Sequence, residues 1–231
     1  TAPAGMPEPE KVWYLDIPRN HTPRALWLLE GDEVVRLPLA RTPNWKVTNP
    51  DDIKSEWWMW EEDSRSNNGG RGVDAVNLTE SPDYYEGALV YTEWDIVMGT
   101  PVALPVTGFD PVRHELAFEG FFTPTYGMRI DRGMRYYLEN KPHYLDSAGE
   151  WWFDEGAGRL YVRLPDDRDP NTAHLEAARH KNLIDLGEVR HLRISGLTFR
   201  FTNVGELGTP GFRITREEHE VACVRMSGNV V

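Results

Sequence analysis

The sequence predicts a mainly β protein in which an antiparallel sandwich-like or barrel-like region is followed by the first rungs of a solenoid. Residues 150–153 and 160–163 are two β-rich runs on either side of a turn-forming stretch, 154–158, and this pattern predicts a hairpin. Over residues 191–199 apolar residues are spaced by two, first at Leu192 and Ile194 and again, after a break at Ser195-Gly196, at Leu197 and Phe199. This spacing gives a strand one apolar face. Signals for helices are few, so sheets dominate the expected fold.

Regularly spaced β-rich runs separated by turn residues predict the antiparallel region. They cover residues 12–17, 24–29, 34–39, 73–78, 88–96, 101–106, 115–122 and 126–130. A connector rich in Pro and Asp follows at residues 165–174. We therefore expect a sandwich-like domain over residues 1–165, entered by an N-terminal strap, and partial solenoid rungs over residues 175–231.

Two stretches depart from the β pattern. Residues 50–63 are the best candidate for a helix, or at least for a helical turn, because Asp51 or Asp52 can cap a first turn and acidic and aromatic residues follow at helical spacing. Residues 64–72, SRSNNGGRG, hold no side chain suited to a core, so we expect a mobile surface loop there.

The solenoid part is expected to contain four strands. They cover residues 175–178, 182–186, 191–201 and 221–227. The runs at 182–186 and 221–226 lie about 39 residues apart, a spacing that fits one rung with an elongated loop. Two partial rungs cannot bury a stack by themselves, so this part should pack against the sandwich or against further chain.

Five short segments carry a family resemblance. They are LARTPNW at residues 39–45, YYLEN at 136–140, GEWWFD at 149–154, GRLYVRLP at 158–165 and HLRISGLTFRFTN at 191–203. In these segments the sequence resembles the right-handed parallel β-helix proteins of bacterial polysaccharide breakdown. That group includes glycoside hydrolases in which an inserted β-sandwich-like domain interrupts the helix.

The resemblance implies a part of a secreted, bacterial-type glycoside hydrolase that acts on plant or other polysaccharides or oligosaccharides. Such a protein is extracellular or periplasmic, and we expect this chain to be an internal segment that carries no signal peptide of its own. The catalytic acids of similar proteins lie on later rungs, so we expect them outside this chain. Two alternatives stay open: a carbohydrate-binding segment without catalysis, and a purely structural β-helix segment.

Composition excludes several other classes. The formal charge of −12 and the absence of a basic cluster argue against nucleic acid as a partner. No apolar run approaches the roughly 20 residues of a membrane span. The single Cys223 permits no internal disulfide and no cysteine metal site, and the histidines lack paired ligand spacing. We therefore expect carbohydrate as the partner and neither a metal nor another cofactor, and we leave the oligomeric state open.

The first candidate for sugar contact is an irregular loop containing Arg41, Asn44 and Trp45. Together these residues offer a charge, an amide and an indole, which suit the hydroxyls and the apolar faces of a sugar. By the resemblance, this loop lies near a cleft between the insert and the helix. The alternative is that Arg41 and Asn44 only satisfy carbonyl groups of the loop.

Tryptophan is unusually frequent, with nine residues in the chain, and provides the second group of candidates. Trp57, Trp58 and Trp60 cannot all face one core, because neighbouring positions diverge on a helix and on a strand. At least one of them should be exposed or lie in a groove. Trp94 and Asp95 are candidates of the same kind. The alternative for all of these tryptophans is a place in the core.

Overall fold

A computed structural model describes residues 2–18, 22–23, 25–44, 46, 48–66, 69–94, 102–120, 128–178, 184–186, 196, 201 and 212–214. Within these residues the fold is mainly β, with several antiparallel sheets and one short α-helix, α1 (Pro82–Tyr85). None of the described helices is long and apolar enough to cross a membrane. The prediction of a mainly β chain with antiparallel sheets is confirmed.

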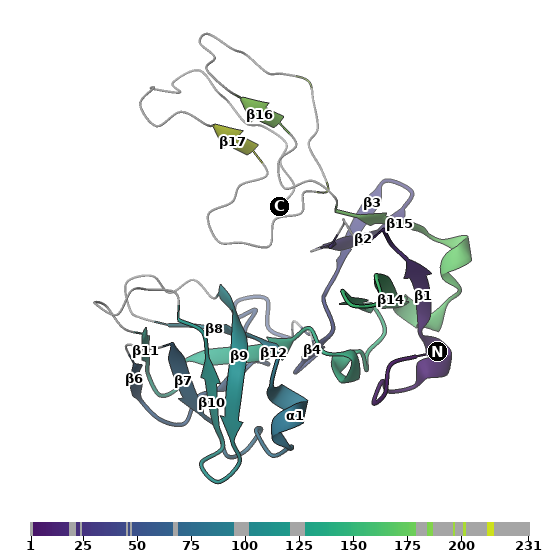
Figure 1. Ribbon diagram of the computed structural model, residues 1–231. Helices are drawn as coiled ribbons and strands as arrows, with labels where there is room; N and C mark the ends of the chain where they lie inside the picture. The colour runs from purple at the N-terminus through teal and green to yellow at the C-terminus, as the bar shows by residue number, and fades with distance from the viewer. Residues whose placement is uncertain are drawn as a thin grey trace.

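Two three-stranded antiparallel sheets form what we call the two-sheet module (Figure 1). One has the order β1 (Trp13–Asp16), β14 (Arg159–Arg163), β13 (Glu150–Asp154), and the other the order β15 (His174–Ala177), β2 (Leu26–Glu30), β3 (Glu33–Leu37). Leu26, Leu28 and Leu37 from the second sheet share one core with Trp151 and Leu160 from the first. Alternating burial along β2 supplies the apolar face that this packing needs.

The hairpin predicted at residues 150–163 is confirmed, and the β-rich runs expected at residues 24–29 and 34–39 form a second hairpin of the two-sheet module. β13 pairs with β14 in register from Glu150–Arg163 to Asp154–Arg159. The turn between them closes where the Asp154 carboxylate accepts a hydrogen bond from the Ala157 N–H group at 2.9 Å. β2 and β3 meet at Gly31, whose φ of 62° suits a residue without a Cβ atom.

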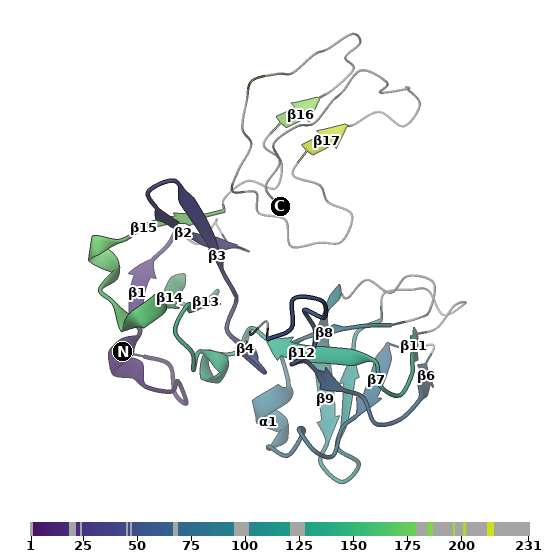
Figure 2. The ribbon, with the colours of Figure 1, turned by 180° about the vertical axis from the view of Figure 1, so that it is seen from behind.

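Seven further strands form an antiparallel module beside the first (Figure 2). The order is β4 (Arg41–Thr42), β12 (Arg135–Glu139), β8 (Leu89–Thr92), β9 (Val102–Asp110), β10 (Glu115–Phe118) and β7 (Gly70–Val73), with β5 (Trp58–Met59) also on β12. β11 (Met128–Ile130) and β6 (Ser64–Ser66) pair separately. Trp60 is at the centre of this module's core, with its ring 3.5 Å from the Tyr136 ring and its indole N–H group bonded to Thr92.

The helix predicted for residues 50–63 is wrong, because the segment forms turns and then β5. The side chains of Asn49 and Asp52 accept hydrogen bonds from backbone N–H groups two residues further on, at Asp51 and Lys54. Such short side-chain bonds close turns and compete with helix formation. The pairing of Trp58 with Tyr136 on β12 then extends the chain as a strand.

The mobile loop predicted for residues 64–72 is also wrong in its described part, which contains β6 and β7. Gly70 and Gly72 are buried, and a Cβ atom on them would overlap the rings of Phe118 and Trp60 respectively. Glycine is therefore what lets β7 lie flat against two large aromatic rings. From the sequence alone, these glycines indicate only a loop.

The C-terminal strands give a mixed result. The strand expected at residues 175–178 exists as β15, but it pairs antiparallel with β2 and completes the two-sheet module. β16 (Ile184–Leu186) pairs in parallel with β17 (Phe212–Ile214), at an offset of about 28 residues, close to the bare rung lengths of solenoids. The strands expected at 191–201 and 221–227 lie outside the described residues, apart from residues 196 and 201. The Phe201 ring lies 5.1 Å from the Trp27 ring on β2.

Candidate functional site at the module junction

The two modules meet along residues 37–42, which are bonded to a strand of each. On one side the Trp151 N–H group donates to the Pro38 carbonyl at 3.2 Å, and the Ala40 N–H group donates to the Trp151 carbonyl at 2.7 Å. On the other side the Asn140 N–H group donates to the Ala40 carbonyl at 3.0 Å. This double pairing brings Arg41, next to Ala40, into the electrostatic neighbourhood of Glu150, next to Trp151.

Arg41 is almost fully enclosed, with 3% of its surface exposed. Its guanidinium carbon lies 3.4 Å from the centre of the Tyr137 ring and 5.6 Å from that of Trp57. Its Nε–H group donates to the Pro43 carbonyl at 3.0 Å. Burial lowers the pKa of Arg41, while Tyr137, Glu139 and Glu150 oppose that change. A guanidinium keeps its charge under such conditions, so the ring faces stabilise a buried cation.

Three aromatic residues at the junction, Trp57, Tyr91 and Tyr137, make up what we call the aromatic group. Tyr91 and Tyr137 are cross-strand neighbours on β8 and β12, with ring centres 5.0 Å apart in a stacked arrangement. The Trp57 ring meets both edge-on, at 4.7 Å from Tyr137 and 6.2 Å from Tyr91. Burial raises the pKa of both phenols. Tyr91 is half-buried and is the member of the group with the most exposed surface.

Glu150 is the second ionisable side chain enclosed at the junction, with 2% of its surface exposed. Within the described part of the chain, neither of its carboxyl oxygens has a hydrogen-bond partner of ordinary geometry. Burial, with a smaller effect of Asp146, raises the pKa of Glu150 to about 8. The nearby N–H groups of Ser147 and Arg41 and the Arg41 charge offset only part of this rise. Glu150 is therefore mostly protonated at neutral pH.

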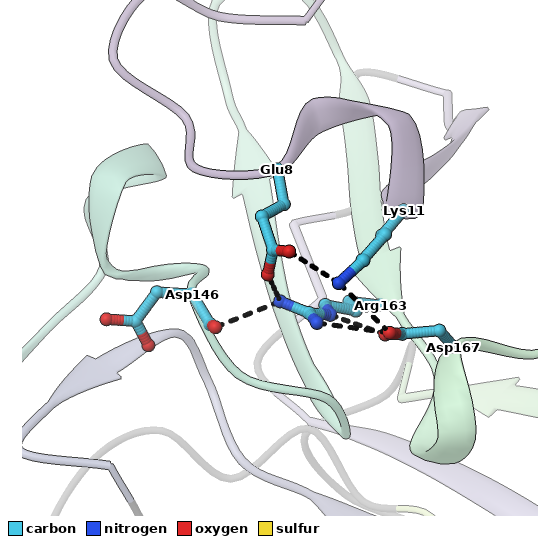
Figure 3. Close-up of polar contacts among 5 residues, drawn as sticks. All are labelled: Glu8, Lys11, Asp146, Arg163 and Asp167. Atoms are coloured by element: carbon cyan, nitrogen blue, oxygen red, sulfur yellow. Dashed lines mark hydrogen bonds and ion pairs between the residues drawn. The ribbon is translucent and has the colours of Figure 1, made fainter.

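Glu150 lies directly opposite a second buried arginine, Arg163, whose donors are bound elsewhere (Figure 3). The Arg163 guanidinium donates to Asp167 at 2.6 and 3.2 Å and to Glu8 at 2.8 Å. It also donates to the Asp146 carbonyl at 2.9 Å. This network holds the N-terminal strap to β14, and it leaves the Glu150 carboxyl without the neutralising partner that its register would allow.

Asn44 and Asp146 form the exposed margin of the junction. Asn44 makes a side-chain hydrogen bond to Asp146, and this bond opposes the rise in the pKa of Asp146 that burial causes. The margin thus presents an amide and a carboxyl group to solvent. These groups can donate to and accept from hydroxyl groups.

The structure brings together only some of the candidates chosen from the sequence. Arg41, Asn44 and Trp57 lie at the junction, whereas Trp45 and Asp95 fall outside the described residues. Trp58 is half-buried against the Tyr136 ring. Trp60 and Trp94 are core residues, each 1% exposed, so neither offers a free ring face.

Four junction residues were missed by the sequence analysis: Tyr91, Tyr137, Asp146 and Glu150. Two of them, Tyr137 and Glu150, stand in segments that carry the family resemblance, YYLEN and GEWWFD. A glutamate beside two tryptophans at the start of a strand is a signal for a buried carboxyl group. The partner that makes it notable, Arg41, is far away in the sequence.

Metal ligands are not gathered at this site. Within the ranges given above, no three His, Cys, Asp or Glu side chains lie close enough together to hold an ion.

Comparison with known proteins gives one informative result. No family model matches the sequence, and no curated protein matches it. A solved structure described as a glycoside hydrolase is similar over 86% of this chain, with a TM-score of 0.53 and 15% sequence identity. The match covers 35% of that structure, so this chain spans about a third of its length. At this identity the similarity is one of fold.

Proposed function

We propose that this chain is part of a carbohydrate-active protein of the glycoside hydrolase type, and that the module junction contacts sugar. The observation that carries the proposal is the junction itself, where the half-buried Tyr91 belongs to an aromatic group and Asn44 stands at the margin. Support also comes from the fold, which is similar to that of a glycoside hydrolase. Aromatic rings suit the C–H faces of sugars, and amide and charged groups suit their hydroxyls.

Catalysis is assigned to the rest of such a protein. Hydrolysis of a glycosidic bond uses two carboxyl groups, one of which is kept protonated. Glu150 has a suitably raised pKa, but with 2% exposure it is closed off from a substrate. We place the catalytic acids on strands that continue the parallel pair β16–β17 as a right-handed parallel β-helix. A protein of this kind acts on polysaccharide outside the cell or in the periplasm.

Titration of the chain with xylo- and galacto-oligosaccharides tests sugar contact. Trp57 is next to Tyr91, so binding at the junction should change tryptophan fluorescence, and calorimetry gives the affinity. Tyr91→Ala should weaken binding by roughly threefold to tenfold, as expected when one aromatic contact is lost.

Tyr14→Ala is the matched control, because Tyr14 is an exposed tyrosine on β1, outside the junction. Affinity that falls with Tyr14→Ala and not with Tyr91→Ala would contradict the junction as the site. No response to any oligosaccharide would contradict sugar binding by this chain.

A purely structural role is the second candidate, and the enclosure of Arg41 and Glu150 favours it. In that case the junction is a joint between modules, and Arg41→Met lowers the melting temperature without changing oligosaccharide affinity. A loss of affinity at unchanged melting temperature would decide for the binding site.

A further inference from the structure

β1 is the outer strand of its sheet, and its apolar side chains are exposed on both faces. Among the strands that the structure describes, β1 pairs with β14 alone. Trp13 and Leu15 lie opposite two β14 residues of the core between the three-stranded sheets, and Tyr14 lies opposite Tyr161 of the other core. Trp13, Tyr14 and Leu15 are nevertheless each at least 40% exposed. Both cores therefore reach the surface at β1.

The composition of β1 is that of an inner strand. Strands covered on both faces contain continuous apolar runs, whereas exposed edge strands are usually protected from pairing by charged residues or proline. Asp16 is the only charged residue of β1, and its carboxylate is bound to Arg159 of β14 at 2.7 Å. The free edge thus contains three large apolar residues and no unbalanced charge.

The backbone of β1 has groups available for another strand. The Ile17 N–H group donates to the Gly158 carbonyl of the neighbouring chain segment at 2.8 Å. Bonded and non-bonded pairs alternate along an antiparallel ladder, so Trp13 and Leu15 also turn their N–H and C=O groups toward β14. Tyr14, between them, turns its N–H and C=O groups toward the free edge.

We propose that β1 pairs antiparallel with β1 of a second copy of this chain, about a two-fold axis at Tyr14. In this register the Tyr14 N–H group of each copy donates to the Tyr14 carbonyl of the other. Trp13 of each copy lies opposite the partner's Leu15 on one face of the joined sheet. Asp16 lies opposite the partner's Val12, so the two carboxylates do not face each other.

Other registers fit less well. A shift of one residue would set the apolar face of one copy beside the opposite face of the other. A second copy therefore matches this edge in backbone bonds, in apolar contacts and in charge. Sugar binding plays no part in this inference.

The resulting dimer is a reversible one. A stable interface buries about 800 Å² on each partner, more than one short strand supplies. The formal charge of −12 on each copy adds a repulsion that salt screens. We therefore expect dimerisation to be concentration-dependent and stronger at high salt.

Sedimentation velocity on the whole chain tests association. Between about 1 µM and about 100 µM the chain should change from monomer to dimer. Raising NaCl from about 0.05 M to about 0.5 M should favour the dimer, because the two copies have the same sign of charge.

Leu15→Lys should weaken dimerisation by about tenfold or more, because it places a charge on the free edge, opposite the partner's Trp13. Val112→Lys is the matched control, since Val112 is an exposed apolar residue in the turn between β9 and β10 and the charge change is the same. It should leave dimerisation unchanged. Circular dichroism checks that both variants are folded.

A disulfide tests the register. The Cα atoms of a bonded antiparallel pair lie about 5.5 Å apart, within the range that a disulfide spans. Tyr14→Cys in a Cys223→Ser background should therefore form a covalent dimer on mild oxidation. Val112→Cys in the same background should not.

Each outcome either supports or overturns the proposal. A chain that is monomeric at about 100 µM overturns it. So does a dimer that Leu15→Lys leaves intact, or one that Tyr14→Cys fails to link. Oligosaccharide affinity is measured separately, so none of these results bears on the proposed function.

Discussion

Two buried arginines, Arg163 on β14 and Arg41 on β4, are stabilised in opposite ways. Arg163, 7% exposed, is surrounded by carboxylates, and its bonds to Asp167 and Glu8 raise its pKa. Arg41, 3% exposed, lies on aromatic rings, and burial lowers its pKa. The first arrangement is an ion-pair network in which each charge has a partner of opposite sign. The second keeps a cation next to a protonated glutamate, and strongly shifted pKa values such as that of Glu150 are frequent at functional sites.

The largest expected effect concerns Glu150 and pH. In the unfolded chain its pKa is about 4.5, whereas in the folded protein it is raised to about 8. Between these values the folded state holds a proton that the unfolded state has lost, so stability is present at low pH and falls as pH rises toward 8. The loss is on the order of 3 kcal/mol between about pH 5 and pH 8. Urea unfolding at a series of pH values measures it.

Glu150→Gln isolates this effect, since the amide cannot ionise. The variant should flatten the pH profile and be more stable than the wild type above about pH 8. Glu155→Gln, an exposed glutamate in the turn of the same hairpin, should leave the profile unchanged. A wild-type profile that is flat between about pH 5 and pH 8 would show that Glu150 is ionised in the folded state.

The next effect tests the ion-pair network of Arg163. Arg163→Met removes the contacts that hold the N-terminal strap to β14 and should cost about 2 kcal/mol, below the range for a fully buried pair because Glu8 and Asp167 are partly exposed. Arg159 is on β14 like Arg163, and it pairs with the exposed Asp16 of β1, so Arg159→Met should cost less than Arg163→Met. Chemical denaturation compares them, and equal costs would mean that the strap network contributes no more than a surface ion pair.

The smallest effect tests the cation–π contact between Arg41 and the Tyr137 ring. Arg41→Lys keeps the charge but loses the flat contact with the Tyr137 ring, so stability should fall by about 1 kcal/mol. Tyr137→Leu should remove most of the difference between arginine and lysine at position 41, which a double-mutant cycle measures. A cycle that shows no coupling would mean that the 3.4 Å contact carries no stabilisation.

Local sequence determined the hairpins and the β class of this protein. The β2–β3 and β13–β14 pairs depend on turn residues and on apolar patterns that lie within a few positions of each other, so the pattern alone predicts them. By contrast, the parallel pair β16–β17 includes residues 212–214, which the sequence pattern did not predict as a strand.

Tertiary structure alone decided the rest. Gly72 lies in a strand because the Trp60 ring fills the place of its missing Cβ atom, and β15 joins β2 because its apolar face completes a core begun near the N-terminus. Arg41 and Glu150 meet only because residues 37–42 are bonded to both β13 and β12. Contacts between residues far apart in the chain depend on packing that no local pattern records, and the candidate site consists of such contacts.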